Sequence, residues 1–205
     1  MKINDLTRCP LKAKSYKDRG EINFVPNHSE LTNEVTVNFS TIHMGTHIDF
    51  KSHKKLKDDI DTPSIIVFKE DEVFYEHIDR ILDYNEQPYS QVKCLCIYTR
   101  TSELEYKNKT YSFQFDYIPR DLCESILHQF PNLECLIIDS LSVGSPLNSV
   151  ENDAVHRLIL ESNIIIVEDV VLSNWTPHFN YLLIIQSFDK SKSLDATFAR
   201  VLQIQ

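Results

Sequence analysis

The segment from residue 43 to residue 53 constrains this chain most, because it gathers three histidines and an aspartate within eleven residues. It reads His-Met-Gly-Thr-His-Ile-Asp-Phe-Lys-Ser-His, so its potential metal donors are His43, His47, Asp49 and His53. Neutral imidazoles and carboxylates are the groups that bind Zn²⁺, Mn²⁺ or Fe²⁺ in proteins. The density of donors therefore indicates a metal site.

The spacing of these donors requires the backbone to bend. In an extended strand, residues four apart are separated by about 13 Å, whereas in a helical turn they approach to about 5–6 Å. Gly45 supplies the conformational freedom for a bend, and the hydroxyl group of Thr46 can hold a turn. We expect a strand that ends near Ile42, a tight bend, and donors that converge on one point. Any one of these histidines could instead be a surface or core residue, and Asp49 alone could be a helix cap.

Composition and charge indicate a globular protein with one domain spanning residues 1–205. Of its 205 residues 42% are hydrophobic and 25% are charged, and no repeat or linker divides them. A net charge of -9 opposes nonspecific binding to nucleic acid or to an anionic membrane. The first residues lack the apolar core of a signal peptide, and no apolar run is long enough to span a bilayer. We therefore expect a cytoplasmic protein.

The cysteines support that location. Their number, five, is odd, and they are scattered along the chain, which favours reduced thiols in the core over a disulfide framework. Cys94 and Cys96 lie inside an apolar run that reads as a buried strand, so a second metal site there is disfavoured.

Hydrophobic periodicity predicts alternating strands and helices. Strands are expected over 34–42, 64–68, 92–99, 135–138, 164–167, 181–187 and 200–204, and helices over 76–84, 121–130 and from Asn148 to Asn163. Residues 11–33 read as loop with at most short strands.

Two further polar residues lie at notable places in the last third of the chain. His156 falls at the edge of the apolar stripe of the predicted helix, and Glu168 follows the buried strand over 164–167. Side chains at strand ends are often functional, because loops there gather residues from distant segments. The loop around Trp175 could wall a pocket or pack in the core. His28, His77, His128 and His178 match no motif and read as surface or structural residues.

A basic patch follows the donor segment, formed by Lys51, Lys54, Lys55 and Lys57. It reads as a solvated loop, and the alternative is that one lysine attracts an anionic group of a substrate.

Together these segments resemble the cyclase family of metal-dependent hydrolases, which includes bacterial kynurenine formamidases and isatin hydrolases. The family signature is His-x-Gly-Thr-His-x-Asp-x-Pro-x-His, and every defined position matches here except the proline, which is Lys51. The resemblance covers nearly the whole chain, because three further segments are similar to family segments: residues 5–7, residues 138–142 and residues 195–200. The departures fall at Lys51, Ala196 and Phe198, which puts loop shape and substrate choice in doubt rather than metal binding.

The resemblance implies a fold, a site and an oligomer. The fold would be of the α/β class, a swivelling β/β/α-type single domain with a mixed β-sheet and flanking helices, in a homodimer or higher homo-oligomer. His43, His47 and Asp49 would hold one divalent ion, and Asp49, His156 and Glu168 could hold a second. We expect Zn²⁺, with Mn²⁺ as the alternative and with one or two ions bound.

The implied activity is hydrolysis of C–N bonds in small, aromatic amides, formamides or lactams, as in an arylformamidase. A metal-bound hydroxide would attack the carbonyl carbon, and His53 would shuttle the proton to the leaving nitrogen. Two other functions stay open: a ring-opening or ring-closing step in specialised metabolism, and metal or ligand binding without turnover.

Overall fold

The computed structural model describes residues 1–8, 22–28, 33–39, 45–49, 65–83, 88–103, 115–186 and 196–205, of which 22–28, 33–39 and 82–83 are described by backbone alone. Residues 43–44 and 50–53 of the predicted site segment lie outside these residues, and they include His43, Lys51 and His53. The rest of the basic patch and Cys9 also lie outside them. His47, Asp49, His156 and Glu168 lie within them.

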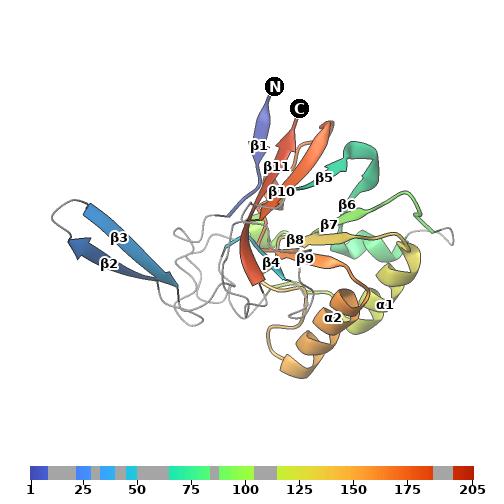
Figure 1. Ribbon diagram of the computed structural model, residues 1–205. Helices are drawn as coiled ribbons and strands as arrows, with labels where there is room; N and C mark the ends of the chain where they lie inside the picture. Colours follow the sequence, from blue (N-terminus) through green and yellow to red (C-terminus); the bar gives the residue numbers. More distant parts are fainter. Residues whose placement is uncertain are drawn as a thin grey trace.

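A mixed sheet of nine strands forms the body of the molecule (Figure 1). Its antiparallel half comprises β1 (Ile3–Asp5), β5 (Ile65–Lys69), β10 (Tyr181–Gln186), β11 (Ala196–Ile204) and β4 (His47–Asp49). Its parallel half comprises β9 (Ile165–Glu168), β8 (Cys135–Ile138), β7 (Cys94–Tyr98) and β6 (Val73–His77). The strand order is β5-β10-β11-β4-β9-β8-β7-β6, with β1 beside β11, so β4 joins the two halves.

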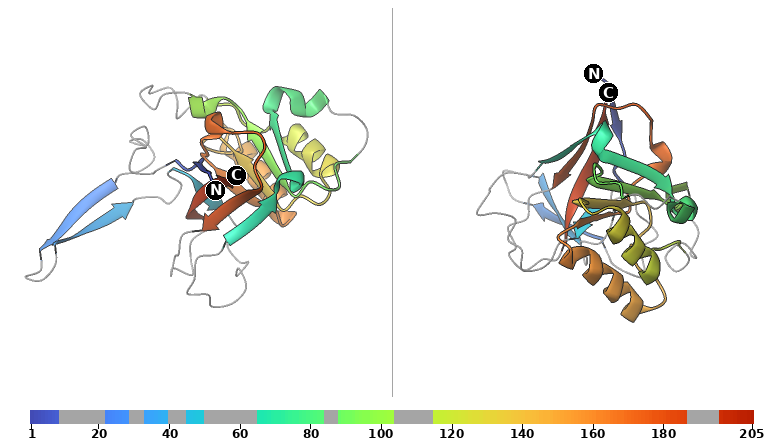
Figure 2. Two further views of the ribbon diagram at one scale, coloured as in Figure 1. Left: turned by 90° about the horizontal axis from the view of Figure 1, so that it is seen from above. Right: turned by 90° about the vertical axis from the view of Figure 1, so that its right-hand side faces the viewer.

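The sheet curls until it is nearly a barrel, and two helices cover the outside of its parallel half (Figures 1 and 2). Helix α1 (Arg120–Gln129) buries Leu122, Cys123 and Ile126. Helix α2 (Ser149–Glu161) begins at Asn148, whose side chain accepts a hydrogen bond from the backbone N–H of Glu151. The predicted α/β class, a mixed sheet with flanking helices, is confirmed.

Residues of the parallel strands alternate between two buried faces. Leu95, Ile97, Leu136, Ile138 and Ile166 pack against the helices. Cys94, Cys96, Cys135, Ile137 and Val167 fill the inside of the curl with residues of β10 and β11. The four described cysteines are free and buried, as predicted. The described part of the chain has no metal-binding cluster that contains a cysteine.

Two sequence predictions are wrong in part. Residues 73–77 form strand β6, and only Ile78–Asp83 is helical, as a 3₁₀ helix. The loop expected over 11–33 contains a seven-residue strand, β2 (Ile22–His28), which pairs with β3 (Asn33–Phe39) in a separate two-stranded ribbon. Pro26 obscured β2, because a proline is tolerated in a strand only where its missing N–H lies on an edge.

Two packing contacts complete the body. Trp175 stacks on Tyr75 with ring centroids 4.7 Å apart, so the aromatic loop packs against the sheet. Arg200 in β11 pairs with Asp5 in β1 at 2.8 Å, which joins two of the segments that carry the family resemblance.

No helix in the described residues combines the length and the apolar character that crossing a bilayer requires.

Candidate metal centre

Strand β4 presents His47 and Asp49 on one face. The residues are two apart in a strand, and Ile48 between them points into the core on the other face, where it is 2% exposed. The expected bend is present, because Gly45 adopts a left-handed φ of 65°. After the bend, however, residues 47–49 are extended rather than helical, because β4 is hydrogen-bonded to β11 on one side and to β9 on the other.

The β4–β9 register brings the third donor into place. His47 lies directly opposite Glu168, the last residue of β9, and residues opposite each other in an antiparallel pair face the same side. The Nε2 atom of His47 lies 3.1 Å from Oε2 of Glu168 and 3.5 Å from Oδ1 of Asp49. All three side chains are buried.

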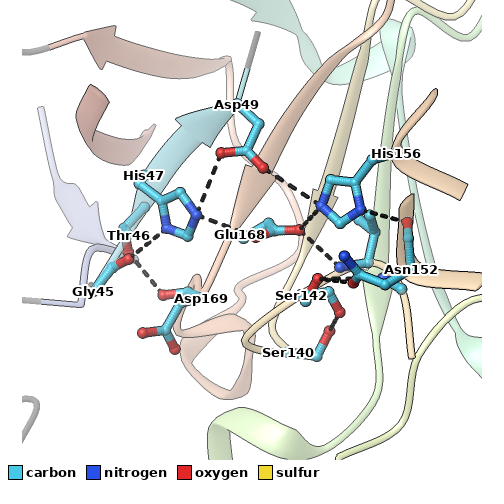
Figure 3. A network of polar contacts seen from close by, with 12 residues as sticks. Gly45, Thr46, His47, Asp49, Ser140, Ser142, Asn152, His156, Glu168 and Asp169 are labelled. Atoms are coloured by element: carbon cyan, nitrogen blue, oxygen red, sulfur yellow. Dashed lines mark hydrogen bonds and ion pairs between the residues drawn. The ribbon is translucent and has the colours of Figure 1, made fainter. Parts of the chain in front are cut away.

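Helix α2 brings His156 to the other side of the same two carboxylates (Figure 3). Its Nε2 atom lies 3.3 Å from Oε1 of Glu168 and 3.5 Å from Oδ2 of Asp49. The two imidazoles thus approach different oxygen atoms of Asp49 and Glu168, one imidazole from each side. His156 is 19% exposed, so this side of the cluster is the more open one.

Both imidazoles are held by backbone carbonyls through their other nitrogen. Nδ1 of His47 lies 2.9 Å from the oxygen of Gly45, and Nδ1 of His156 lies 2.8 Å from the oxygen of Asn152. A carbonyl can only accept, so Nδ1 carries a proton in each ring, and Nε2 is the atom left for a ligand. Histidines that bind metals are usually oriented in this way.

The loop between β8 and α2 fixes Glu168 and α2. The backbone N–H of Val143 donates to Oε1 of Glu168 at 2.7 Å, and the Ser142 hydroxyl donates to Oδ1 of Asn152 at 3.0 Å. Gly144 lies so close to α2 that a Cβ atom there would come within 2.6 Å of the Cα of Asn152. Close contact between this loop and α2 therefore sets the position of His156.

Burial and charge act against each other at this cluster. Burial disfavours the imidazolium form of His47, but its hydrogen bond to Glu168 and the charge of Asp49 outweigh burial and raise its pKa to about 9. Burial also disfavours the imidazolium form of His156, but its hydrogen bonds to Asp49 and Glu168 outweigh burial and raise the pKa of His156 to about 11. Burial and Asp49 oppose ionisation of Glu168, but its contacts with His156 and His47 prevail and lower its pKa.

The distances are also compatible with a shared cation. Charge-assisted N–H···O bonds usually measure about 2.7–2.9 Å, and the four N···O separations here are 3.1–3.5 Å. Two ligands bound to Zn²⁺ at about 2.1 Å with tetrahedral angles lie about 3.4 Å apart. His47, Asp49 and Glu168 form the compact group, each with a ligand atom within 4.8 Å of the others, and His156 adjoins it.

Four of the six predicted site residues thus lie together, and His43 and His53 fall outside the described residues. Sequence reasoning missed the residues that hold the donors, notably Asn152, Val143 and Gly144. The chain has only 3 glycines, and this scarcity was the available sequence signal for a special role of Gly144. The Thr46 hydroxyl, expected to hold the turn, instead donates to the carbonyl oxygen of Asp169 at 2.9 Å.

The sequence matches no protein-family model and no curated protein. Its structure is similar to three solved structures over nearly its whole length. The first is a predicted metal-dependent hydrolase from Bacillus stearothermophilus, with 18% identity, 98% of this chain and 97% of that chain covered, and a TM-score of 0.68. The second, a potential metal-dependent hydrolase with cyclase activity, has 18% identity, 98% of each chain covered and a TM-score of 0.65.

The third is isatin hydrolase A from Ralstonia solanacearum, with 14% identity, 100% of this chain and 92% of that chain covered, and a TM-score of 0.60. At these identities the likeness establishes the fold. The names of the three proteins agree with the family that the residue 43–53 signature resembles.

Gly144→Ala should displace α2 and with it His156. The added methyl group would meet the backbone of Asn152, and overpacking of this kind costs about 1–3 kcal/mol. We expect lower stability in chemical unfolding and weaker zinc binding by the folded protein. If both stay at the wild-type values, the loop does not set the position of the helix.

Stability of the chelator-treated protein should fall as pH rises. A histidine with a raised folded-state pKa stabilises the fold fully below its unfolded pKa of about 6.5, and this stabilisation is lost as pH rises through the folded value. For His47 the window is pH 6.5 to about 9, and the loss is on the order of 2–3 kcal/mol. Urea unfolding across this range measures it. His156, whose pKa is raised to about 11, loses stabilisation over the same range, so His47→Gln should reduce the slope without abolishing it. His178→Gln, at a residue whose side chain is 93% exposed, should leave it unchanged.

Proposed function

We propose that this protein is a metal-dependent hydrolase that cleaves C–N bonds in small, aromatic amides, formamides or lactams. The observation that carries the proposal is the donor arrangement: two imidazoles, each oriented by a backbone carbonyl, face two buried carboxylates at 3.1–3.5 Å. The fold shared with proteins named metal-dependent hydrolase and isatin hydrolase supports it further.

The chain's own residues divide into ligands and supports. We propose that His47, His156, Asp49 and Glu168 hold one or two divalent ions, with His43 joining them, and that the metal is Zn²⁺ or else Mn²⁺. A bound Zn²⁺ lowers the pKa of water to about 7 and polarises a carbonyl oxygen. Gly45 and Asn152 keep Nε2 of each imidazole turned to the ion, and the Val143 N–H fixes one oxygen of Glu168.

His53 is the proposed acid–base group. The residue 43–53 signature places it four residues after Asp49. An imidazole with a pKa near neutrality can take a proton from the attacking water and deliver it to the leaving nitrogen.

Two alternatives remain. A ring-opening or ring-closing step in specialised metabolism would use the same metal ligands. Two of the similar structures are named for cyclase activity and for isatin hydrolysis, and these names favour such a step as much as arylformamidase chemistry. A protein that binds metal without turnover would have the same ligands and no need for His53.

Turnover should depend on the metal. We expect the protein to hydrolyse at least one member of a panel of N-formyl anilides and cyclic aryl lactams, to lose this activity after chelation, and to regain it with Zn²⁺ or Mn²⁺. Elemental analysis of the same samples measures metal content. No turnover on the panel with metal fully bound would favour the non-catalytic alternative.

The same assay tests His53. His53→Ala should lower kcat by about 10²–10⁴-fold, the usual contribution of one acid–base group, and should retain the metal. Loss of the metal would make His53 a ligand instead. His178→Ala is the control, and both its activity and its metal content should match the wild type.

We also propose that the chain forms a homodimer through the outer face of its antiparallel strands. Such a face is usually polar when it borders water. Here Ile3, Ile65, Val67 and Tyr181 are 45–56% exposed. The register joins them to other apolar residues of the same face, because Val67 lies opposite Leu183 and both Tyr181 and Ile3 lie opposite Ile204.

The β2–β3 ribbon of a second copy is the proposed occupant of this face. Its register pairs Ile22, Phe24 and Pro26 with Phe39, Val37 and Val35, so alternate positions of both strands are apolar. A two-stranded ribbon is marginally stable alone. Figure 1 and the left view of Figure 2 show the ribbon standing away from the body of its own chain.

Solution mass tests the dimer. We expect twice the chain mass for the wild type, and the monomer mass for Ile65→Glu/Val67→Glu and for Phe24→Ser/Val37→Ser. Leu147→Glu/Val150→Glu is the matched control, since these residues are 77% and 78% exposed outside the face. A monomeric wild type would refute the dimer, and a dimeric ribbon variant would refute the ribbon as the occupant.

A further inference from the structure

Arg8 lies next to the candidate metal centre, directly after residues 5–7, although no sequence pattern singles out Arg8 itself. It follows β1 and is 7% exposed. Its backbone pairs twice with Thr46: the N–H of Thr46 donates to the Arg8 oxygen at 3.0 Å, and the N–H of Arg8 donates to the Thr46 hydroxyl at 2.7 Å. Thr46 immediately precedes His47, so Arg8 is anchored beside the first donor.

The side chain of Arg8 reaches the segment of a second donor. Its Nε atom lies 2.8 Å from Oδ1 of Asp169, the residue immediately after Glu168. Asp169 is fully buried and has a φ of 56°, a left-handed conformation that aspartate tolerates better than most residues. Its backbone N–H donates to the oxygen of Ser140 at 2.9 Å.

Thr46 is hydrogen-bonded to both Arg8 and Asp169. Its hydroxyl accepts from the Arg8 N–H and donates to the carbonyl oxygen of Asp169 at 2.9 Å, as Figure 3 shows for the Asp169 contact. Residues 46 and 169 therefore flank His47 and Glu168, which lie opposite each other in the β4–β9 register. Arg8, Thr46 and Asp169 form a closed triangle of contacts, which we call the Arg8 triangle.

We propose that Arg8 is a positioning residue for the metal: through the Arg8 triangle it fixes the separation of His47 and Glu168 and so raises the affinity for the ion. The proposal rests on the metal binding in the proposed function but on no part of the reaction. Arg8 would act on the placement of the two ligands. Its guanidinium group contacts Asp169, and its backbone is hydrogen-bonded to Thr46.

The competing explanation is a buried ion pair that serves stability alone. A buried pair often adds little stability over well-packed apolar groups, whereas removing one partner strands the other charge. A single substitution at Arg8 therefore mixes two effects. Substituting both partners by uncharged residues removes the stranded charge and leaves only the loss of the ion pair between them.

The test compares zinc affinity in four proteins: wild type, Arg8→Met, Arg8→Met/Asp169→Asn and Arg200→Met. Arg200→Met is the matched control, because it removes an arginine–aspartate contact of the same 2.8 Å length at an exposed place in β11. Competition with a chromophoric chelator gives the Kd for Zn²⁺, and the absorption spectrum of the Co²⁺-loaded protein reports the ligand geometry. Circular dichroism confirms that each protein is folded.

We expect Arg8→Met and the double variant to bind Zn²⁺ about 10–100-fold more weakly, the usual effect of losing a residue that orients a ligand. Their Co²⁺ spectra should differ from the wild type, and Arg200→Met should match it. If the folded double variant regains wild-type affinity and spectrum, Arg8 serves stability alone and the proposal is refuted. If Arg8→Met does not fold, the double variant decides. A wild type that binds no Zn²⁺ would refute the proposed function itself, which is a different outcome.

Discussion

Two carboxylates buried side by side, those of Asp49 and Glu168, impose the constraint on which the rest of the structure depends. Neither side chain is more than 7% exposed, and like charges in such a place repel unless positive charge is supplied. The chain supplies two imidazoles, one from β4 and one from α2, and each faces both carboxylates. In the protein alone the compensating charge is protons on those imidazoles, and a divalent cation would replace the protons. Metal binding and proton release are therefore coupled.

The fold serves this cluster through a short central strand. β4 has only three residues, yet it is hydrogen-bonded on both sides, to β11 and to β9. That position fixes His47 and Asp49 on one face and sets Glu168 opposite His47. Helix α2 is separately tied to the β8–α2 loop through Gly144 and Asn152. The cluster is thus assembled from elements that are far apart in sequence and rigid in their local contacts.

Much of this could be predicted from the sequence, for reasons that particular elements make clear. α1, α2 and the parallel strands β7, β8 and β9 were recognisable because their apolar periodicity is local. The motif marks His47 and Asp49, and the end of a predicted strand marks Glu168. His156 was marked by the family resemblance, and metal binding by these residues stays a prediction. The full length of the ribbon strand β2 was not expected because Pro26 and polar neighbours hide its alternation. Strand β6 was missed because Glu76 and His77 were assigned to a helix and residues 73–75 to no element. Arg8, Asp169 and Val143 act through contacts between distant segments, and such contacts leave no local pattern in a sequence.

The most direct test of the central claim is anomalous diffraction at the zinc absorption edge from crystals of the protein supplied with one equivalent of Zn²⁺. An ion held as proposed would give a peak about 2.0–2.2 Å from Nε2 of His47 and from one oxygen each of Asp49 and Glu168. A second peak beside His156 would indicate two ions. A map with no peak among these side chains, or with zinc bound elsewhere while the two imidazoles stay hydrogen-bonded to the carboxylates, would contradict the account.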